Sequence, residues 1–156
     1  MEYIGGPAQT GCLFCRVRDA DPSADQANLL VWRGERTTIV MNKFPYNSGH
    51  VMVAPVEHVS SPVELSDGDA LALQKGVSLS LRAISDVMSP EGYNIGANLG
   101  RVAGAGIPDH VHYHVVPRWS GDTNFMPVLA ETKVVNEHLE RTWGKLTAAF
   151  RRVAAG

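Results

Sequence analysis

This 156-residue chain lacks the sequence features that are typical of several classes of protein, and each missing feature excludes one class. It has only two cysteines, too few for the disulfide framework of a small secreted domain, so they indicate a metal site or a redox pair. No apolar run approaches the roughly 18 residues that span a bilayer, and the N-terminus lacks the basic-then-apolar order of a signal peptide. Together these features predict a cytoplasmic protein. The formal net charge of -2 argues against a broadly basic face for nucleic acid.

The composition is that of an ordinary globular protein, with 44% hydrophobic and 19% charged residues. The length fits one domain, 1–156, with a real hydrophobic core. Short apolar runs bounded by turn residues predict strands, and two longer helical stripes predict helices. We expect strands at 29–32, 37–41, 50–55, 92–100 and 110–119, helices at 66–88 and 136–153, and mostly loop over 1–26. This order predicts an α+β fold, a mainly antiparallel sheet with one long central helix and a C-terminal helix on one face.

The segment 110–119, which reads HVHYHVVPRW, holds three of the six histidines at alternate positions. Strand side chains alternate between two faces, so His110, His112 and His114 are expected on one face. A lone histidine in a strand is usually structural. Three on one face are different, because packing does not repay the desolvation of three imidazoles. Imidazole can act as nucleophile, acid, base or metal ligand near neutral pH, so a functional interpretation is favoured.

The pattern His-apolar-His-apolar-His-apolar-apolar resembles the signature of the histidine-triad family of nucleotide hydrolases and transferases. The resemblance covers about residues 12–119. Asn42 lies eight residues before His50, which follows a glycine and opens a strand, and Asn98 precedes the triad at about the family spacing. The segments 92–100, 117–119 and 121–125 look most like those of bacterial diadenosine tetraphosphate phosphorylases.

The resemblance implies a role for three of the histidines. His112 would attack the α-phosphorus of a nucleotide and form a covalent nucleotidyl-histidine. Its ring would be oriented by the main-chain carbonyl of His114, which fixes the tautomer. The side chains of His114 and His50 would lie beside the phosphates, where a cationic ring stabilises developing charge.

The resemblance also implies which residues would bind the nucleotide. Asn42 would hold the ribose hydroxyls, although asparagine at such a position is otherwise typical of a turn. Asn98 would help to hold the phosphates, together with backbone N–H groups of a glycine-rich loop. Those groups belong to Gly104, Ala105 and Gly106. Trp119 would contact an adenine, in the same or a neighbouring subunit, and packing is the alternative role.

Cys12 and Cys15 form a CxxC motif that is open to three interpretations. A thioredoxin-type redox site needs a βαβ context that the loop-rich N-terminus does not offer, and an inert pair of thiols is also possible. A Zn2+ site needs two further ligands. In related bacterial proteins these follow the Gly-His strand and open the triad, so the resemblance assigns them to His58 and His110. The closed Cys2His2 set would be structural and would tie the N-terminal loop to the catalytic strand.

We therefore expect an enzyme that cleaves diadenosine tetraphosphate by phosphorolysis to ATP and ADP through a nucleotidyl-His112 intermediate. Gly106 stands where the fragile-histidine-triad hydrolases carry a glutamine, which favours phosphate as the acceptor, and Lys43 and Arg101 are expected to border the site. Two alternatives stay open: hydrolysis of a dinucleotide or a phosphoramidate, and a slow nucleotide-binding sensor. The expected partner is a nucleotide, without nucleic acid or membrane. The relatives pair equivalent sheets, so a homodimer or a dimer of dimers is expected.

Overall fold

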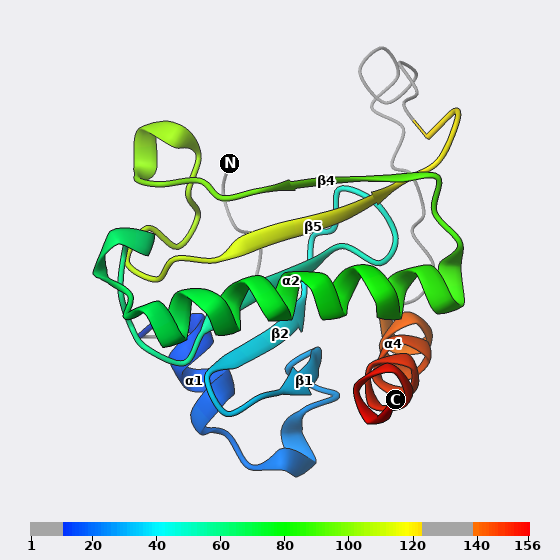
Figure 1. The fold of residues 1–156 in the computed structure, drawn as a ribbon, viewed down its shortest axis with the longest axis horizontal. Helices are drawn as coiled ribbons and strands as arrows, with labels where there is room; N and C mark the ends of the chain where they lie inside the picture. The colour runs from blue at the N-terminus through cyan, green and yellow to red at the C-terminus, as the bar shows by residue number, and fades with distance from the viewer. Residues whose placement is uncertain (1–10, 123–138) are drawn as a thin grey trace.

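The computed structural model describes residues 11–122 and 139–156, which form a five-stranded antiparallel sheet in the order β1-β2-β3-β5-β4 (Figure 1). The strands are β1 (Leu30–Arg33), β2 (Thr37–Met41), β3 (Val51–Pro55), β4 (Gly92–Gly96) and β5 (Tyr113–Arg118). The helices are α1 (Leu13–Asp19), α2 (Asp67–Met88) and α4 (Leu139–Ala155), with short 3-10 turns at Pro22–Ala24, Pro62–Glu64 and Arg101–Ala103.

The α+β architecture predicted from the sequence is confirmed. Residues 123–125 of the family-like segment and 136–138 of the expected C-terminal helix lie outside the described residues. No described helix has the length and apolar character of a membrane span.

Helices α2 and α4 cover one face of the sheet (Figure 1). Alternate side chains of the strands point toward these helices and form the larger core, because strand residues two apart share a face. From the strands, this core takes Val31, Ile39, Met41, Val51, Val53 and Val115. The start of α2 is also as predicted, since Ser66 is its N-cap and the hydroxyl accepts the N–H of Asp69.

The opposite face of the sheet carries α1, a helix that the sequence analysis does not expect. Within the described residues 11–26, Leu13–Asp19 is helical where loop was predicted. Phe14 and Val17, three residues apart, are buried on one side of α1. They pack against a second apolar cluster formed by Leu30, Val40, Met52 and Ala54. A seven-residue helix is marginal by itself, so this tertiary packing, rather than local propensity, decides its conformation.

The register between β3 and β5 places the triad on the α1 face. Met52 pairs directly with His114, and Met52 belongs to the cluster around α1. Directly paired residues share a face, so His114 points to the α1 side while its neighbour Tyr113 packs toward α2. Strands β4 and β5 are both shorter than the expected strands at 92–100 and 110–119. Strand β5 pairs with β3 only from Tyr113 onward, and β4 stops pairing at Gly96.

Gly76 allows α2 to lie close against β3, since a Cβ added there would be 2.8 Å from Val53 Cγ1. In a helix interior alanine is usually more stable than glycine by about 0.5–1 kcal/mol. Here the steric overlap between the added Cβ and Val53 outweighs the helix preference for alanine. We therefore expect Gly76→Ala to lower the free energy of unfolding by about 1–3 kcal/mol. Gly144 in α4 is the matched control, because a Cβ there meets nothing within 4 Å and alanine should be neutral or stabilising. Urea unfolding of both variants measures the difference, and equal effects would contradict close packing at Gly76.

Candidate functional site

Three histidines meet on the α1 face of the sheet. His50 directly precedes β3 and His114 is the second residue of β5, so the antiparallel pairing brings their rings together. The Nε2 atom of His50 lies 2.9 Å from Nδ1 of His114. The ring centroids of His112 and His114 are 5.0 Å apart. The structure thus brings together the three imidazoles that the sequence analysis expects near the phosphates.

Hydrogen bonds determine which nitrogen of each ring carries the proton. The main-chain N–H of Tyr46 donates to Nδ1 of His50 at 3.2 Å, so the proton of neutral His50 lies on Nε2. That Nε2–H donates to Nδ1 of His114, whose own proton is therefore on Nε2. Nδ1 of His112 lies 2.8 Å from the main-chain carbonyl oxygen of His110. A carbonyl can only accept, so His112 carries its proton on Nδ1 and keeps a lone pair on Nε2.

The carbonyl that orients His112 is not the expected one, and the assignment to His114 is wrong. His114 lies within the sheet, where it pairs with Met52 on one side and Gly96 on the other. His110 precedes β5, and its carbonyl accepts from His112 instead. The lone pair on Nε2 of His112 is the same in either arrangement.

Burial keeps these rings neutral at pH 7. The side chain of His50 is 1% exposed, and burial, with the charges of His114 and His112, lowers its pKa to about 3. Burial and the charge of His112 lower the pKa of His114 to about 4. Burial also lowers the pKa of His112, against the bond to the His110 carbonyl, which raises it. The expectation of a cationic His50 or His114 does not hold in the free protein, whereas a bound anion would raise both pKa values.

Two aromatic residues that the sequence analysis did not single out complete this surface. The ring centroid of Tyr46 is 4.8 Å from that of His50, although the Tyr46 side chain is 70% exposed. The ring of Phe14, in α1, lies 5.1 Å from His110 and 4.9 Å from His112. The position of Phe14 inside the CxxC motif is the signal that could have linked it to the triad.

The residues expected to bind the nucleotide lie on loops around the sheet. The side-chain oxygen of Asn42 accepts the N–H of Phe44 at 2.8 Å, which is the turn role left open above. Nδ2 of Asn98 is 3.5 Å from the carbonyl oxygen of Gly104, so Asn98 reaches the glycine-rich loop. That loop continues through Ala105 and Gly106, which are half-buried and exposed respectively.

The remaining predicted residues flank the same region. Lys43 and Arg101 are exposed on the loops after β2 and β4. Trp119 directly follows β5 and is half-buried, and its main-chain N–H donates to a carboxylate oxygen of Asp122 at 3.0 Å.

A second group of side chains joins α1 to the segments after β3 and before β5. Its members, Cys12, Cys15, His58 and His110, have their ligand atoms within 4.8 Å of one another. Cys12 is the N-cap of α1 and Cys15 lies in its first turn, so both thiols face the same side of the helix. The four residues predicted from the motif and the resemblance are therefore neighbours in space.

The distances in this Cys2His2 group suit a tetrahedral ion. Bonds of about 2.3 Å to sulfur and about 2.0 Å to nitrogen imply edges of about 3.5 Å between sulfur and nitrogen and about 3.3 Å between two nitrogens. The Cys12 Sγ–His110 Nδ1 and Cys15 Sγ–His58 Nδ1 distances are both 3.2 Å, and Cys15 Sγ–His110 Nδ1 is 3.7 Å. The two Nδ1 atoms are 3.2 Å apart. A single cation would match all of these separations.

The hydrogen bonding of His110 supports the same conclusion. Its Nε2–H donates to the carbonyl of Pro55 at 2.9 Å, so Nδ1 of the neutral ring presents a lone pair to the group. A proton on Nδ1 of His58 could form a hydrogen bond to Nδ1 of His110, but it would satisfy only these two nitrogens. A metal ion would satisfy both rings and both sulfurs at once, so the donor set fits Zn2+.

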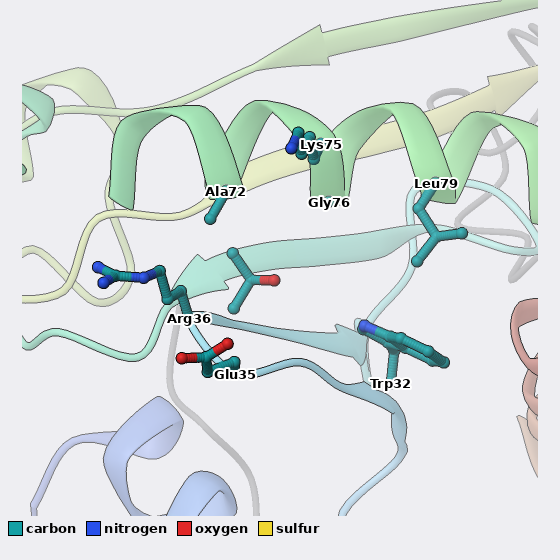
Figure 2. A pocket seen from close by; sticks show the side chains of 8 residues that line it. Trp32, Glu35, Arg36, Ala72, Lys75, Gly76 and Leu79 are labelled. Atoms are coloured by element: carbon teal, nitrogen blue, oxygen red, sulfur yellow. The ribbon is translucent and has the colours of Figure 1, made fainter. Parts of the chain in front are cut away.

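A hollow of about 230 Å3 lies on the opposite face of the sheet, between α2 and the β1–β2 hairpin (Figure 2). It is lined by Trp32, Glu35, Arg36, Thr37, Ala72, Lys75, Gly76 and Leu79. None of the predicted site residues lines it. The histidines on the α1 face, rather than this hollow, are therefore the candidate active site.

The lowered pKa of His50 makes stability depend on pH. Its unfolded imidazole titrates near pH 6.5 and the folded one near 3, so the unfolded state binds more protons between these values. The contribution of His50 is therefore complete above about pH 6.5 and is lost as pH falls toward 3. From pH 7 to pH 5, His50 alone should lower the free energy of unfolding by about 2 kcal/mol. Urea unfolding of His50→Gln should show a correspondingly shallower loss, and parallel pH profiles would contradict the burial argument.

Comparisons with known proteins agree with the arrangement of the histidine triad on this sheet. Residues 23–121 match the family model of the HIT domain. Over 129 residues the chain is 39% identical to the AP-4-A phosphorylase of Mycobacterium tuberculosis, a match that covers 83% of this chain but 66% of that relative. An uncharacterised HIT-like protein of Methanocaldococcus jannaschii is 32% identical over 111 residues, 71% of this chain and 81% of that one.

Solved structures share the fold. A hypothetical histidine triad nucleotide-binding protein of Sulfolobus tokodaii superposes with a TM-score of 0.69 at 26% identity, and the match covers 92% of both chains. A zinc-bound histidine triad protein of Mycobacterium smegmatis, 22% identical, has a TM-score of 0.71 and covers 92% of this chain and 96% of its own. From the triad geometry, the matched domain and these relatives, it follows that the chain belongs to the histidine-triad (HIT) family.

Proposed function

We propose that this chain cleaves diadenosine tetraphosphate with inorganic phosphate, giving ATP and ADP through a covalent adenylyl group on His112. The observation that carries the proposal is the pattern of protons on the three histidines. The bond from Nδ1–H of His112 to the His110 carbonyl leaves its Nε2 free as a nucleophile. The chain from Tyr46 through His50 places a proton on Nε2 of His114, beside that nucleophile. The 39% identical relative named as an AP-4-A phosphorylase supports this choice of substrate.

The reaction would proceed as two displacements. In the first, the lone pair on Nε2 of His112 bonds to the α-phosphorus, and the bond from that phosphorus to an oxygen of the departing ATP breaks. The proton on Nδ1 of His112 stays in place, and the positive charge that develops on the ring is stabilised by the His110 carbonyl. ATP is a stable anion at neutral pH, so His114 needs only to donate a hydrogen bond from Nε2–H to the phosphate oxygens.

In the second displacement, an oxygen of inorganic phosphate attacks the same phosphorus. The phosphorus–nitrogen bond breaks, ADP forms and His112 returns to its neutral state. Gly106 is exposed and has no side chain that would fill the space needed by the attacking inorganic phosphate. Exposed Lys43 and Arg101 provide positive charge on the adjoining loops, which favours a phosphate dianion over water as the acceptor.

The test is incubation of the protein and diadenosine tetraphosphate with and without 18O-labelled inorganic phosphate. We expect phosphate to raise the cleavage rate and the label to appear in ADP but not in ATP. His112→Asn is the matched variant, because its amide can still donate to the His110 carbonyl but offers no nucleophile. It should bind nucleotide and lose at least about 10³-fold in kcat, without acquiring an adenylyl group detectable by mass spectrometry. Products of AMP and ATP at the same rate in saturating phosphate would instead identify a hydrolase.

We also propose that Cys12, Cys15, His58 and His110 bind one structural Zn2+. The separations described above support this assignment, and a zinc-bound histidine triad protein shares the fold. When bound, the ion would supply a cross-link between α1, the segment after β3 and the start of the triad. With four protein ligands it would have no open position for substrate, so its contribution would be to stability rather than to chemistry.

Purified protein should therefore contain about one zinc per chain. Cys12→Ala should lose the metal and lower the melting temperature, because the free energy of metal binding contributes to folding. Arg16→Ala, on the same helix but without a ligand atom, should retain both. Metal analysis and thermal unfolding measure these properties. A metal-free wild type, or a Cys12→Ala variant with full metal content, would refute the site.

A further inference from the structure

The turn that contacts His50 is tied to the chain after β5 by one asparagine. Nδ2 of Asn47 donates to a carboxylate oxygen of Asp122 at 2.6 Å and to the carbonyl of Pro117 at 3.1 Å. Nε and Nη2 of Arg118 also donate to Asp122, each at 2.7 Å. The side chain of Asp122 is 11% exposed, so this carboxylate is a largely buried junction rather than a surface charge.

The anchored turn supplies two hydrogen bonds to His50. The main-chain carbonyl of Asn47 accepts the N–H of His50 at 3.1 Å, and the N–H of Tyr46 donates to Nδ1 of the imidazole. Gly49 completes the turn with a φ of +82°, and a Cβ there would lie 2.6 Å from Met88 Sδ. The turn is therefore held between the end of α2 and the Asp122 carboxylate.

The direction of the hydrogen-bond chain depends on the position of that turn. With Tyr46 donating to Nδ1, His50 donates from Nε2 and His114 keeps its proton on Nε2. If the Tyr46 N–H moved away, His50 could carry its proton on Nδ1 and accept at Nε2 from Nδ1–H of His114. His114 would then present a lone pair at Nε2, which repels phosphate oxygens instead of donating to them.

We propose that Asn47 is a positioning residue for the His50–His114 pair and that Asp122 is its anchor. Asn47 acts through Tyr46 and His50 and need not touch substrate. The inference about protonation stands on the free protein, and its kinetic consequence rests on the function proposed above. The same carboxylate accepts the N–H of Trp119, so it joins the histidine pair to the residue expected at the adenine.

The test compares Asn47→Ala with Asn94→Ala in 15N-histidine NMR spectra of the free, full-length protein. In the wild type, His50 and His114 should carry protons on Nε2, and His112 on Nδ1. Asn47→Ala should produce a mixture of tautomers at His50 and His114 and lower kcat by about 10–100-fold, with KM changed by less than about 3-fold. Asn94→Ala removes a contact of 2.6 Å to Arg118 in the same network without touching the turn, so it should leave tautomers and kcat unchanged.

Asp122→Asn is a nearly isosteric second variant for the case in which Asn47→Ala does not fold. It should shift the tautomers in the same direction. Wild-type tautomers in the folded variants would overturn the inference, whatever their activity. If the tautomers shift but diadenosine tetraphosphate is not cleaved by the wild type, the proposed function fails and the positioning role of Asn47 stands.

Discussion

The antiparallel pairing of β3 with β5 is the constraint on which both groups of histidines depend. It places the start of β3 beside His114, so His50 and His114 meet at 2.9 Å. It also places the chain after β3 beside the start of the triad, where the N–H of Val111 donates to the carbonyl of Val59 and the rings of His58 and His110 come together. A slip of one residue would turn every side chain of β5 to the other face and separate both groups.

His110 links the Cys2His2 group to the triad histidines, because it contacts a member of each group and also bonds to the sheet. Its Nδ1 faces the thiols, its Nε2–H donates to Pro55, and its carbonyl orients His112. Phe14, between the two cysteines in sequence, packs against both rings. Whatever fixes the Cys2His2 group therefore also restricts His112, so the proposed metal ion would act indirectly on the nitrogen that is proposed to react.

His50 and His114 are neutral, and hydrogen bonds satisfy three of their four ring nitrogens. Burial lowers their pKa values to about 3 and about 4. The Tyr46 N–H and the bond between the rings pair both nitrogens of His50 and Nδ1 of His114. Burial also lowers the pKa of His112, so its Nε2 is unprotonated at pH 7. A buried group of neutral, oriented donors also suits an anionic substrate, because the donors need no reorganisation as charge develops.

The sequence by itself determined the strands, the long helix from Asp67 to Met88 and the common face of the triad. These depend on local properties: the alternation of side chains, the period of the apolar residues and the cap at Ser66. The family resemblance supplied His50, His58 and the two cysteines as partners of the triad. Only the tertiary structure decided that α1 is helical, that His110 rather than His114 orients His112, and that Asn47 and Asp122 anchor the turn before His50. Each of these depends on contacts between segments far apart in the chain, whose geometry no local pattern encodes.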